Sequence, residues 1–273
     1  MPPRQPTAAD PLDPLDPAAL VGPGLLAGCE WLAEAPSTMD RAREIAADQA
    51  TALPRAVGAD RQLAGRGRRG ARWWQPPGSL AVSIVVAVEG GASPPPPGWS
   101  LACGVAVAEA IRELEPGAEA VVRWPNDVEV AGRKLAGILV EAAAAGRAIF
   151  GIGVNTTGSA ADAPAAIAPR VATMPDITGR VLARQRLLAA LVPRLLTLLA
   201  DVARDPTVLG DRYRRLCCLS GRTVAVHVGD ARIEGTCRGI AADGRLVIDT
   251  VAGRQLIASG SLTPPADVWR GEP

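Results

Sequence analysis

Hydrophobic and polar positions divide the chain into a proline-rich start, a middle of mixed helical and strand patterns, and a last part of short alternating runs. In the middle part, β-branched and apolar residues run from Ser79 to Val88, which predicts a buried strand. Small apolar residues after a Ser100 cap predict a helix over 101–114 that packs closely on a sheet. Further strands are predicted at VVRW, VEV, KLAGILVEA and AIFGIGVNT. This part therefore predicts four or five strands in one sheet, with helices packed on it.

Two more helices and another strand follow from the same patterns. The segment STMDRAREIAAD begins with a Ser or Thr cap at Ser37, places Asp40 in the first turn and predicts a helix. The segment AVGADRQ predicts a short strand. Residues 181–203 form a long amphipathic pattern, and we expect this helix to be bent or broken at Pro193.

The two ends of the chain differ from the middle. Residues 1–28 contain repeated Asp-Pro and other prolines, a composition that predicts a disordered tail. Residues 220–265 carry short alternating runs separated by Gly and Asp turn signals, which predict a small all-β, barrel-like module. We therefore expect an α+β protein with a tail at 1–28, a main domain at 29–218 and a β module at 219–273.

Composition excludes several classes of function. The chain has 29 Lys+Arg and 28 Asp+Glu, a formal net charge of +1, so no global field attracts nucleic acid or a membrane. The longest apolar stretch is interrupted by Arg194 and Asp201, and no signal peptide is recognisable, which predicts a cytosolic protein. The odd count of 5 Cys without a C-x-x-C pair favours reduced thiols over disulfides or a zinc site.

Among the 29 basic residues, Lys134 is the single lysine. A compact ammonium and a planar guanidinium are not equivalent, so this position indicates a functional lysine, although one leftover surface lysine is the simpler alternative. Strand alternation is expected to place Lys134 at the mouth of an otherwise apolar face made of Ala136, Ile138 and Val140. In such a low-dielectric pocket an ammonium stabilises developing negative charge strongly. Gly137 is typical of a ligand approaching the backbone closely.

The loop GRGRRG at 65–70 matches the dinucleotide-binding pattern G-x-G-x-x-G, but Pro76 and Pro77 forbid the helix that must follow it. Nor does it fit a Walker A loop. Residues 61–78 instead contain no acid and five arginines: Arg61, Arg66, Arg68, Arg69 and Arg72. Glycine freedom and bidentate guanidinium groups predict a clamp for nucleotide phosphates. The alternatives are a solvated flexible loop and an RNA contact in which Trp73 and Trp74 stack on bases.

Two asparagines, the only ones in the chain, lie in further motif-like segments. Asn126 and Asp127 stand in a Pro-Asn-Asp turn, which turn chemistry alone explains, yet a carboxylate beside phosphates also suits Mg²⁺. Asn155 ends the segment GIGVNT, where small residues let a ligand lie against the strand end or let the strand pack tightly.

The ordered combination of PSTMDRA, DRQLAGRGRRG with a following Trp, RWPND, KLAGILVE and GIGVNT resembles the biotin protein ligases. These enzymes attach biotin to a lysine of carboxylase carrier domains. The similarity is strong from Ala35 to about Thr156, and residues 219–265 resemble the SH3-like C-terminal domain of the family. The resemblance implies a mixed sheet with packed helices, followed by a small SH3-like barrel. Lipoate ligases share this fold but are not expected to carry the GRGRRG and WPND segments together.

The resemblance also implies roles for individual residues. Those expected to contact biotin are Ser37, Thr38, Met39, Gln62, Arg66, Gly67, Arg68 and Lys134. Those expected to act in catalysis are Lys134, Arg66 and Arg68. Those expected on the nucleotide side are Arg69, Trp73, Asn126 and Asn155, with Asp127 as a contact to Mg²⁺. This chain departs from the usual family pattern at Ala71, where Arg is common, at Met39, where Asn is common, and at Leu63, where Thr is common.

The implied reaction uses ATP, Mg²⁺ and biotin. The biotin carboxylate attacks the α-phosphorus of ATP to give biotinyl-5′-AMP, and the lysine of a biotin carboxyl carrier domain then takes the biotinyl group. The short proline-rich start leaves no room for a winged helix-turn-helix, so we expect no DNA binding. The alternatives are a lipoate ligase, an arginine-loop RNA-binding module and an inactive scaffold that only holds carrier proteins.

Overall fold

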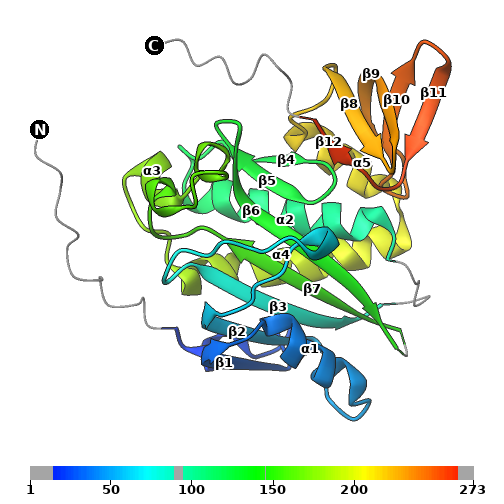
Figure 1. Cartoon of the computed structure of the whole chain (residues 1–273). Coiled ribbons are helices and arrows are strands. Elements are labelled where there is room, and N and C mark those ends of the chain that lie inside the picture. Colours follow the sequence, from blue (N-terminus) through cyan, green and yellow to red (C-terminus); the bar gives the residue numbers. More distant parts are fainter. Residues whose placement is uncertain (1–14, 89–94, 145, 264–273) are drawn as a thin grey trace, which may run out of the picture.

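The structure, a computed structural model, describes residues 15–88, 95–144 and 146–263 (Figure 1). Within them the larger sheet has seven strands in the order β1-β2-β3-β7-β6-β5-β4. These strands are β1 (Gly28–Ala35), β2 (Arg55–Gln62), β3 (Leu80–Ala87), β4 (Val121–Arg123), β5 (Asp127–Val130), β6 (Arg133–Ala143) and β7 (Arg147–Val154). β1 and β2 pair in parallel and the other neighbours pair antiparallel, so the sheet is mixed, as predicted.

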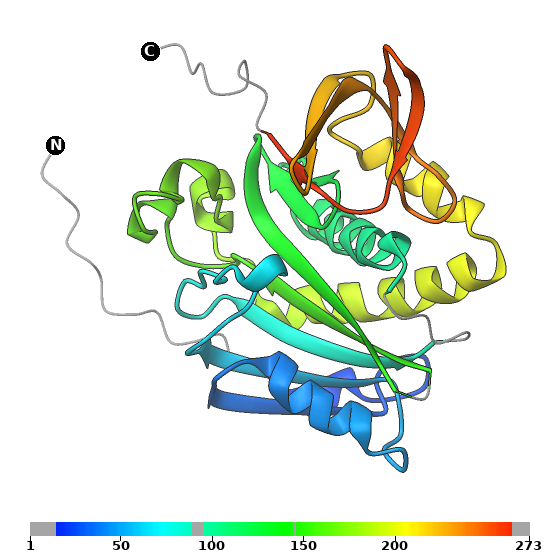
Figure 2. The same cartoon turned by 45° about the vertical axis from the view of Figure 1, so that its right-hand side comes forward.

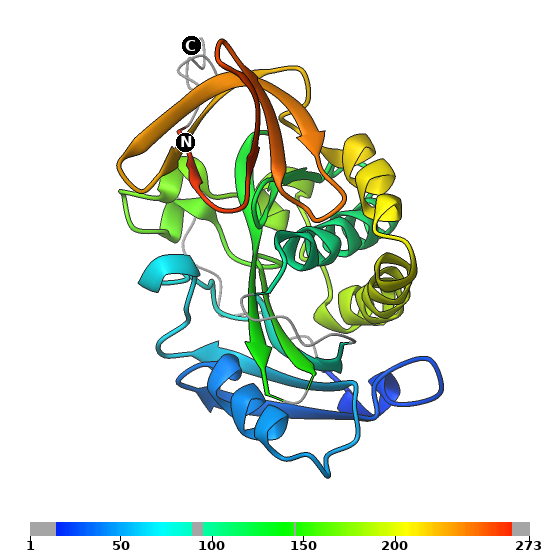
Figure 3. The same ribbon diagram turned by 90° about the vertical axis from the view of Figure 1, so that its right-hand side faces the viewer.

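Helices cover the two faces of this sheet unequally (Figures 2 and 3). On one face, α1 (Thr38–Ala47) packs against β2, β3 and β7. On the other, α2 (Pro97–Leu114) packs on β6, and both α4 (Arg184–Arg204) and α5 (Thr207–Leu216) pack on α2. A short helix, α3 (Met174–Thr178), follows the long segment after β7. Short 3-10 turns lie at Pro17–Leu20, Arg68–Gly70, Ala160–Asp162 and Ala168–Arg170.

A second, antiparallel sheet follows α5 and has the order β11-β10-β9-β8-β12. Its strands are β8 (Thr223–Val228), β9 (Ala231–Ile240), β10 (Leu246–Thr250), β11 (Gly253–Ile257) and β12 (Ser261–Leu262). This C-terminal module joins the main domain where the Gly98 amide donates to the Asp243 carbonyl and where β9 packs against α5. The predicted α+β organisation, with a separate small β module, is confirmed.

Side chains along β7 point alternately to the two faces of the larger sheet, and they differ between the faces in what they pack against. Ala148, Phe150, Ile152 and Val154 point into the large core that contains α2 and α4. On the opposite face, Ile149 packs with Met39, Ala42, Ile45 and Ala46 of α1. Arg147 on that face donates to the carbonyls of Ile45 and Asp48 at the end of α1, and the other two residues, Gly151 and Gly153, leave part of the face without side chains of its own. The uncovered part is available for a ligand.

The first part of the chain corrects the expected tail. Residues 1–14 lie outside the described residues, but from residue 15 the chain is packed rather than disordered. Leu20 and Leu26 are each only 1% exposed and belong to the large core. Asp16 accepts from the Ala18 amide at the start of the first 3-10 turn. Prolines in this stretch shape a compact turn, and two buried leucines offset the cost of ordering it.

Other predictions need smaller corrections. Ser100 does not cap its helix, because α2 begins three residues earlier at Pro97, and the Ser100 hydroxyl instead donates to the carbonyls of Pro97 and Pro125. α4 continues through Pro193 without a break, because its buried leucines hold both halves against α2. β1 was not predicted. Among the described residues no helix has both the length and the apolar character to cross a membrane.

The packed N-terminal segment leads to a prediction. Replacing Leu20 by Ala removes a fully buried side chain and is expected to lower the free energy of unfolding by about 3 kcal/mol. Val21→Ala is the matched control, because Val21 is 42% exposed and is expected to change stability little. Urea unfolding of both variants measures the difference. Equal stability of the two variants would restore the view that this segment is a tail.

Candidate functional site

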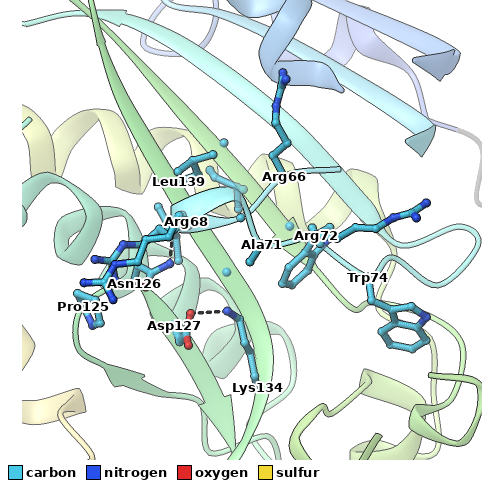
Figure 4. A pocket seen from close by; sticks show the side chains of 18 of the residues that line it. Arg66, Arg68, Ala71, Arg72, Trp74, Pro125, Asn126, Asp127, Lys134 and Leu139 are labelled. Atoms are coloured by element: carbon cyan, nitrogen blue, oxygen red, sulfur yellow. Dashed lines mark hydrogen bonds and ion pairs between the residues drawn. The ribbon is translucent and has the colours of Figure 1, made fainter. Parts of the chain in front are cut away.

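A cavity of about 510 Å³ lies on the α1 face of the larger sheet (Figure 4). Its floor is formed by β6 and β7, and its rim by the arginine loop (residues 65–72), the start of α1, the segment around Arg170 and strand β12 of the C-terminal module. The lining contains seven basic side chains and two acidic ones. Because the whole chain has a formal net charge of only +1, this local excess of positive charge favours an anionic ligand.

Glycines shape the floor of the cavity. A Cβ atom added at Gly153 would lie 2.5 Å from the Trp73 ring, and one added at Gly151 would lie 2.7 Å from the Met39 sulfur. At Gly137 an added Cβ would meet both the Trp73 ring at 3.0 Å and Cε of Lys134 at 3.1 Å. Side chains from other elements therefore lie directly on the backbone of β6 and β7, and larger residues there would fill the space.

Lys134 reaches the cavity through a β-bulge. In the pairing of β5 with β6, Glu129 lies opposite Lys134 while Val128 lies opposite Ala136, so Leu135 is an extra residue. The bulge shifts the alternation, and Lys134 faces the cavity together with Gly137. The prediction that Lys134 shares a face with Ala136, Ile138 and Val140 is therefore wrong, since Ala136 and Ile138 point into the large core.

The ammonium group of Lys134 has defined neighbours. Its Nζ lies 2.6 Å from Oδ1 of Asp127 and 5.6 Å from the centroid of the Trp73 ring. The side chains of Lys134 and Asp127 are 32% and 25% exposed, so this ion pair is partly shielded from water. The lysine is thus held at the floor of the cavity rather than extended into solvent, which argues against a leftover surface residue.

Asn126 joins the floor to the arginine loop. Its Nδ2 donates to the Ile138 carbonyl over 2.8 Å, and its Oδ1 accepts from Arg68 over 3.2 Å. Burial and the neighbouring Arg69 charge lower the pKa of the Arg68 guanidinium, and the Asp127 charge opposes this effect. Arg68 thus contacts Asn126, and Lys134 contacts Asp127. Because these are consecutive residues of the RWPND turn, two cations converge on one part of the cavity.

The remaining arginines of the loop are anchored at the rim. Arg66 forms an ion pair with Asp40 of α1 and points toward that helix in Figure 4. Arg69 donates to the Ser261 hydroxyl over 2.7 Å. Arg72, which follows Ala71, donates to the Leu63 carbonyl over 3.1 Å. In this structure neither Arg66 nor Arg72 places its guanidinium beside Lys134.

The start of α1 is fixed by a short polar network. Ser37 accepts from the Met39 amide as the helix cap. The Thr38 amide and hydroxyl both donate to Oε1 of Gln62, over 3.0 and 3.3 Å, and the hydroxyl lies 2.8 Å from that of Ser83. These side chains are largely buried and hold the rim of the cavity in one arrangement.

The side-chain amide of Asn155 forms a hydrogen bond through its nitrogen only, within the described residues. Its Nδ2 donates to the Ala172 carbonyl over 2.9 Å, while Oδ1 is buried and has no donor among the described residues. The indole Nε1 of Trp73 is likewise buried without an acceptor. Since buried polar atoms are normally paired, both atoms suit a polar ligand in the cavity. The Trp73 ring lies against Gly153, so one of its faces is already covered by β7.

The structure brings all the predicted site residues to the lining of this one cavity. They are Ser37, Thr38, Met39, Gln62, Arg66, Gly67, Arg68, Arg69, Trp73, Asn126, Asp127, Lys134 and Asn155. Sequence reasoning missed the contributions of Arg170 and Val171, which follow β7, and of Gly260 to Leu262 in the C-terminal module. Arg170 lies in an unremarkable Ala- and Pro-rich segment, and no local motif distinguishes Ser261.

The residues present do not form a resident metal centre. Within the described ranges no three or more His, Cys, Asp or Glu side chains gather closely enough to hold a metal ion. Asp127 is one carboxylate that Lys134 already neutralises. A single carboxylate of this kind suits a Mg²⁺ that is held mainly by the phosphates of a bound nucleotide.

Comparison with known proteins gives consistent matches. Residues 32–156 match the Biotin/lipoate A/B protein ligase family, and residues 219–261 match the Biotin protein ligase C terminal domain. The chain is 31% identical over 221 residues to a biotin--[acetyl-CoA-carboxylase] ligase of Paracoccus denitrificans, covering 77% of this chain and 88% of that protein. It is 34% identical over 206 residues to the ligase of the same description from Mycobacterium tuberculosis, covering 74% and 75%.

Two further similarities concern a longer relative and a solved structure. The chain is 35% identical over 204 residues to the bifunctional ligase/repressor BirA of Escherichia coli, covering 70% of this chain but 60% of BirA. A biotin protein ligase from Aquifex aeolicus, solved in complex with biotin and ATP, has a TM-score of 0.75 and 27% identity. That match covers 86% of this chain and 97% of the Aquifex chain.

The glycine floor leads to a prediction. Gly153→Ala is expected to push the Trp73 ring off β7 and into water, which shifts tryptophan emission to longer wavelength. The shift should be absent when the same change is made in a Trp73→Phe background. Gly117→Ala is the control, because an added Cβ there meets no atom within 4 Å. An unchanged spectrum for Gly153→Ala would contradict the placement of the ring.

Proposed function

The chain belongs to the biotin protein ligase family, and from this membership we propose how its cavity works. The protein is a ligase that activates biotin with ATP and transfers the biotinyl group to a lysine of a carboxylase carrier domain. The observation that carries the proposal is the position of Lys134, the single lysine, on the floor of a strongly basic cavity beside Arg68. We propose that the glycine floor accepts biotin and that the arginine loop accepts the phosphates.

In the first half-reaction, the biotin carboxylate oxygen forms a bond to the α-phosphorus of ATP while the bond to the pyrophosphate oxygen breaks. Negative charge builds on the oxygens of the α-phosphate. Lys134 and Arg68, which converge on the turn at Asn126 and Asp127, are positioned to stabilise this charge. The ammonium of Lys134 also lies where it can hold the biotin carboxylate, and the products are biotinyl-5′-AMP and pyrophosphate.

In the second half-reaction, the amine of the carrier lysine attacks the acyl carbon of the mixed anhydride and AMP leaves. No covalent intermediate with this protein is required. Because water also attacks such an anhydride, the arginine loop has a second role in covering it until the carrier arrives.

The remaining predicted contacts follow the same division. We propose that Ser37, Thr38, Met39 and Gln62 form the biotin side of the cavity. Asn155 and Trp73, whose buried Oδ1 and Nε1 atoms have no partner among the described residues, are the proposed contacts on the nucleotide side. Mg²⁺ enters as part of Mg-ATP, and Asp127 is the proposed protein contact to it. We also propose that the enzyme is cytosolic and that it does not bind DNA, since a formal net charge of +1 gives no general attraction to nucleic acid.

The overall proposal is tested by the exchange of labelled pyrophosphate into ATP. We expect exchange that depends on biotin and does not occur with lipoate, followed by biotinylation of a carrier domain when one is added. Exchange that depends on lipoate instead would assign the chain to the lipoate ligases. Salt-sensitive RNA binding without any exchange would favour the RNA-binding alternative.

Lys134→Arg tests the central residue. A planar guanidinium keeps the charge but cannot occupy the same place between Asp127 and Gly137, so we expect the exchange rate to fall by about 100-fold, as when one transition-state donor is removed. The matched control is Arg133→Lys, a neighbouring residue outside the cavity lining, which is expected to keep its activity. Unchanged exchange in Lys134→Arg would contradict the assigned role.

A further inference from the structure

Among the described residues, one hydrogen bond connects the arginine loop to the C-terminal module, from Arg69 to Ser261, which lie 192 positions apart. We propose that Ser261 is a positioning residue, which holds the loop over the cavity through Arg69. Arg69 is then a latch for the loop rather than a phosphate contact. This inference rests on the proposed function for its effect on catalysis, but the latch itself is a property of the ligand-free protein.

The backbone of Arg69 supports this assignment. Arg69 has φ 55° and ψ 33°, the left-handed conformation that residues other than glycine rarely adopt. Gly70, which follows, also has a positive φ of 75°. A residue kept in such a conformation needs surrounding contacts to hold it there. The turn supplies one such contact, the hydrogen bond from the Ala71 amide to the Arg68 carbonyl, and the bond from the Arg69 guanidinium to Ser261 of β12 supplies another.

Ser261, the acceptor of this hydrogen bond, lies on a strand that is closely packed against its neighbour. Ser261 pairs with His227 and Leu262 pairs with Val226 of β8. Directly before them, an added Cβ at Gly260 would lie 2.5 Å from Cγ1 of Val226, so β12 is packed closely on β8. Because the module is itself bonded to the main domain, Ser261 is a fixed point at the rim of the cavity.

The loop is therefore held at two places on opposite sides of the cavity. Arg66 binds Asp40 of α1 on one side, and Arg69 binds Ser261 on the other. Between them, Arg68 points to Asn126. Both ties lie at exposed positions, where water competes with them, so each can open for substrate entry and close again. The C-terminal module thus contributes directly to the closed form of the active site.

The first test uses hydrogen–deuterium exchange of residues 63–74 in the ligand-free protein. Ser261→Ala removes the acceptor and is expected to raise amide exchange in this segment about fivefold, the factor typical of one lost hydrogen bond. Ser261→Thr keeps a hydroxyl and is expected to restore protection. The control is Ser259→Ala, an exposed serine two residues away that does not line the cavity. Unchanged exchange in Ser261→Ala would overturn the latch.

The second test measures how well the acyl-adenylate is retained. With biotin and ATP but no carrier, Ser261→Ala is expected to release AMP about fivefold faster relative to its pyrophosphate exchange rate, at an unchanged melting temperature. Arg69→Ala should produce the same ratio, and the double variant should add nothing further. An unaltered ratio in Ser261→Ala, or an additive double variant, would overturn the proposed positioning role.

The two tests separate the failure of the latch from the failure of the function. If the unmodified protein shows no biotin-dependent exchange, the proposed function fails, whereas amide protection in Ser261→Ala still decides the latch. If exchange is present but Arg69→Ala alone abolishes it while Ser261→Ala has no effect, Arg69 contacts phosphate and the latch is wrong.

Discussion

The cavity depends on a difference in side-chain size between the two faces of the larger sheet. Along β7 the residues at even positions are apolar and fill the core under α2, while the opposite face carries Gly151 and Gly153. Close packing on one side keeps the strands in place, and missing side chains on the other leave room above them. The bulge at Leu135 adds one charged group, Lys134, to this otherwise uncharged floor. The catalytic geometry is therefore built from the pairing of strands.

Electrostatics follows from that geometry. Lys134 and Arg68 are held by Asp127 and Asn126, two adjacent residues of one turn, so a single local conformation orients both cations. Seven basic side chains around the cavity leave it with an excess of positive charge that a triphosphate or an acyl-adenylate offsets. Outside the lining, acidic residues outnumber basic ones, so the attraction of anions is limited to this one region.

Much of the site was predictable because its motifs carry local chemistry. The arginine loop, the RWPND turn and the glycines of GIGVNT each indicated a ligand from residue type alone, and the structure gathers them at one cavity. The face occupied by Lys134 was mispredicted, because a one-residue bulge has no local signature in an apolar strand. The proposed role of Ser261 could not be predicted from local sequence, because it arises from a contact with Arg69, which lies 192 positions away in the chain. The segment around Leu20 was predicted to be disordered because of its proline content, although Leu20 and Leu26 belong to the core.

The floor of the cavity has an unusual source of rigidity. Gly137 lies directly opposite Gly153, and Leu139 opposite Gly151, in the ladder between β6 and β7. A cross-strand pair of glycines supplies no side-chain contact of its own, and glycine also gains the most backbone freedom when a strand loosens. The flatness of the cavity floor is therefore imposed by the Ile138–Ile152 pair on the opposite face of the sheet. Volume changes in that hidden layer, remote from any substrate, will be felt first as altered ligand affinity.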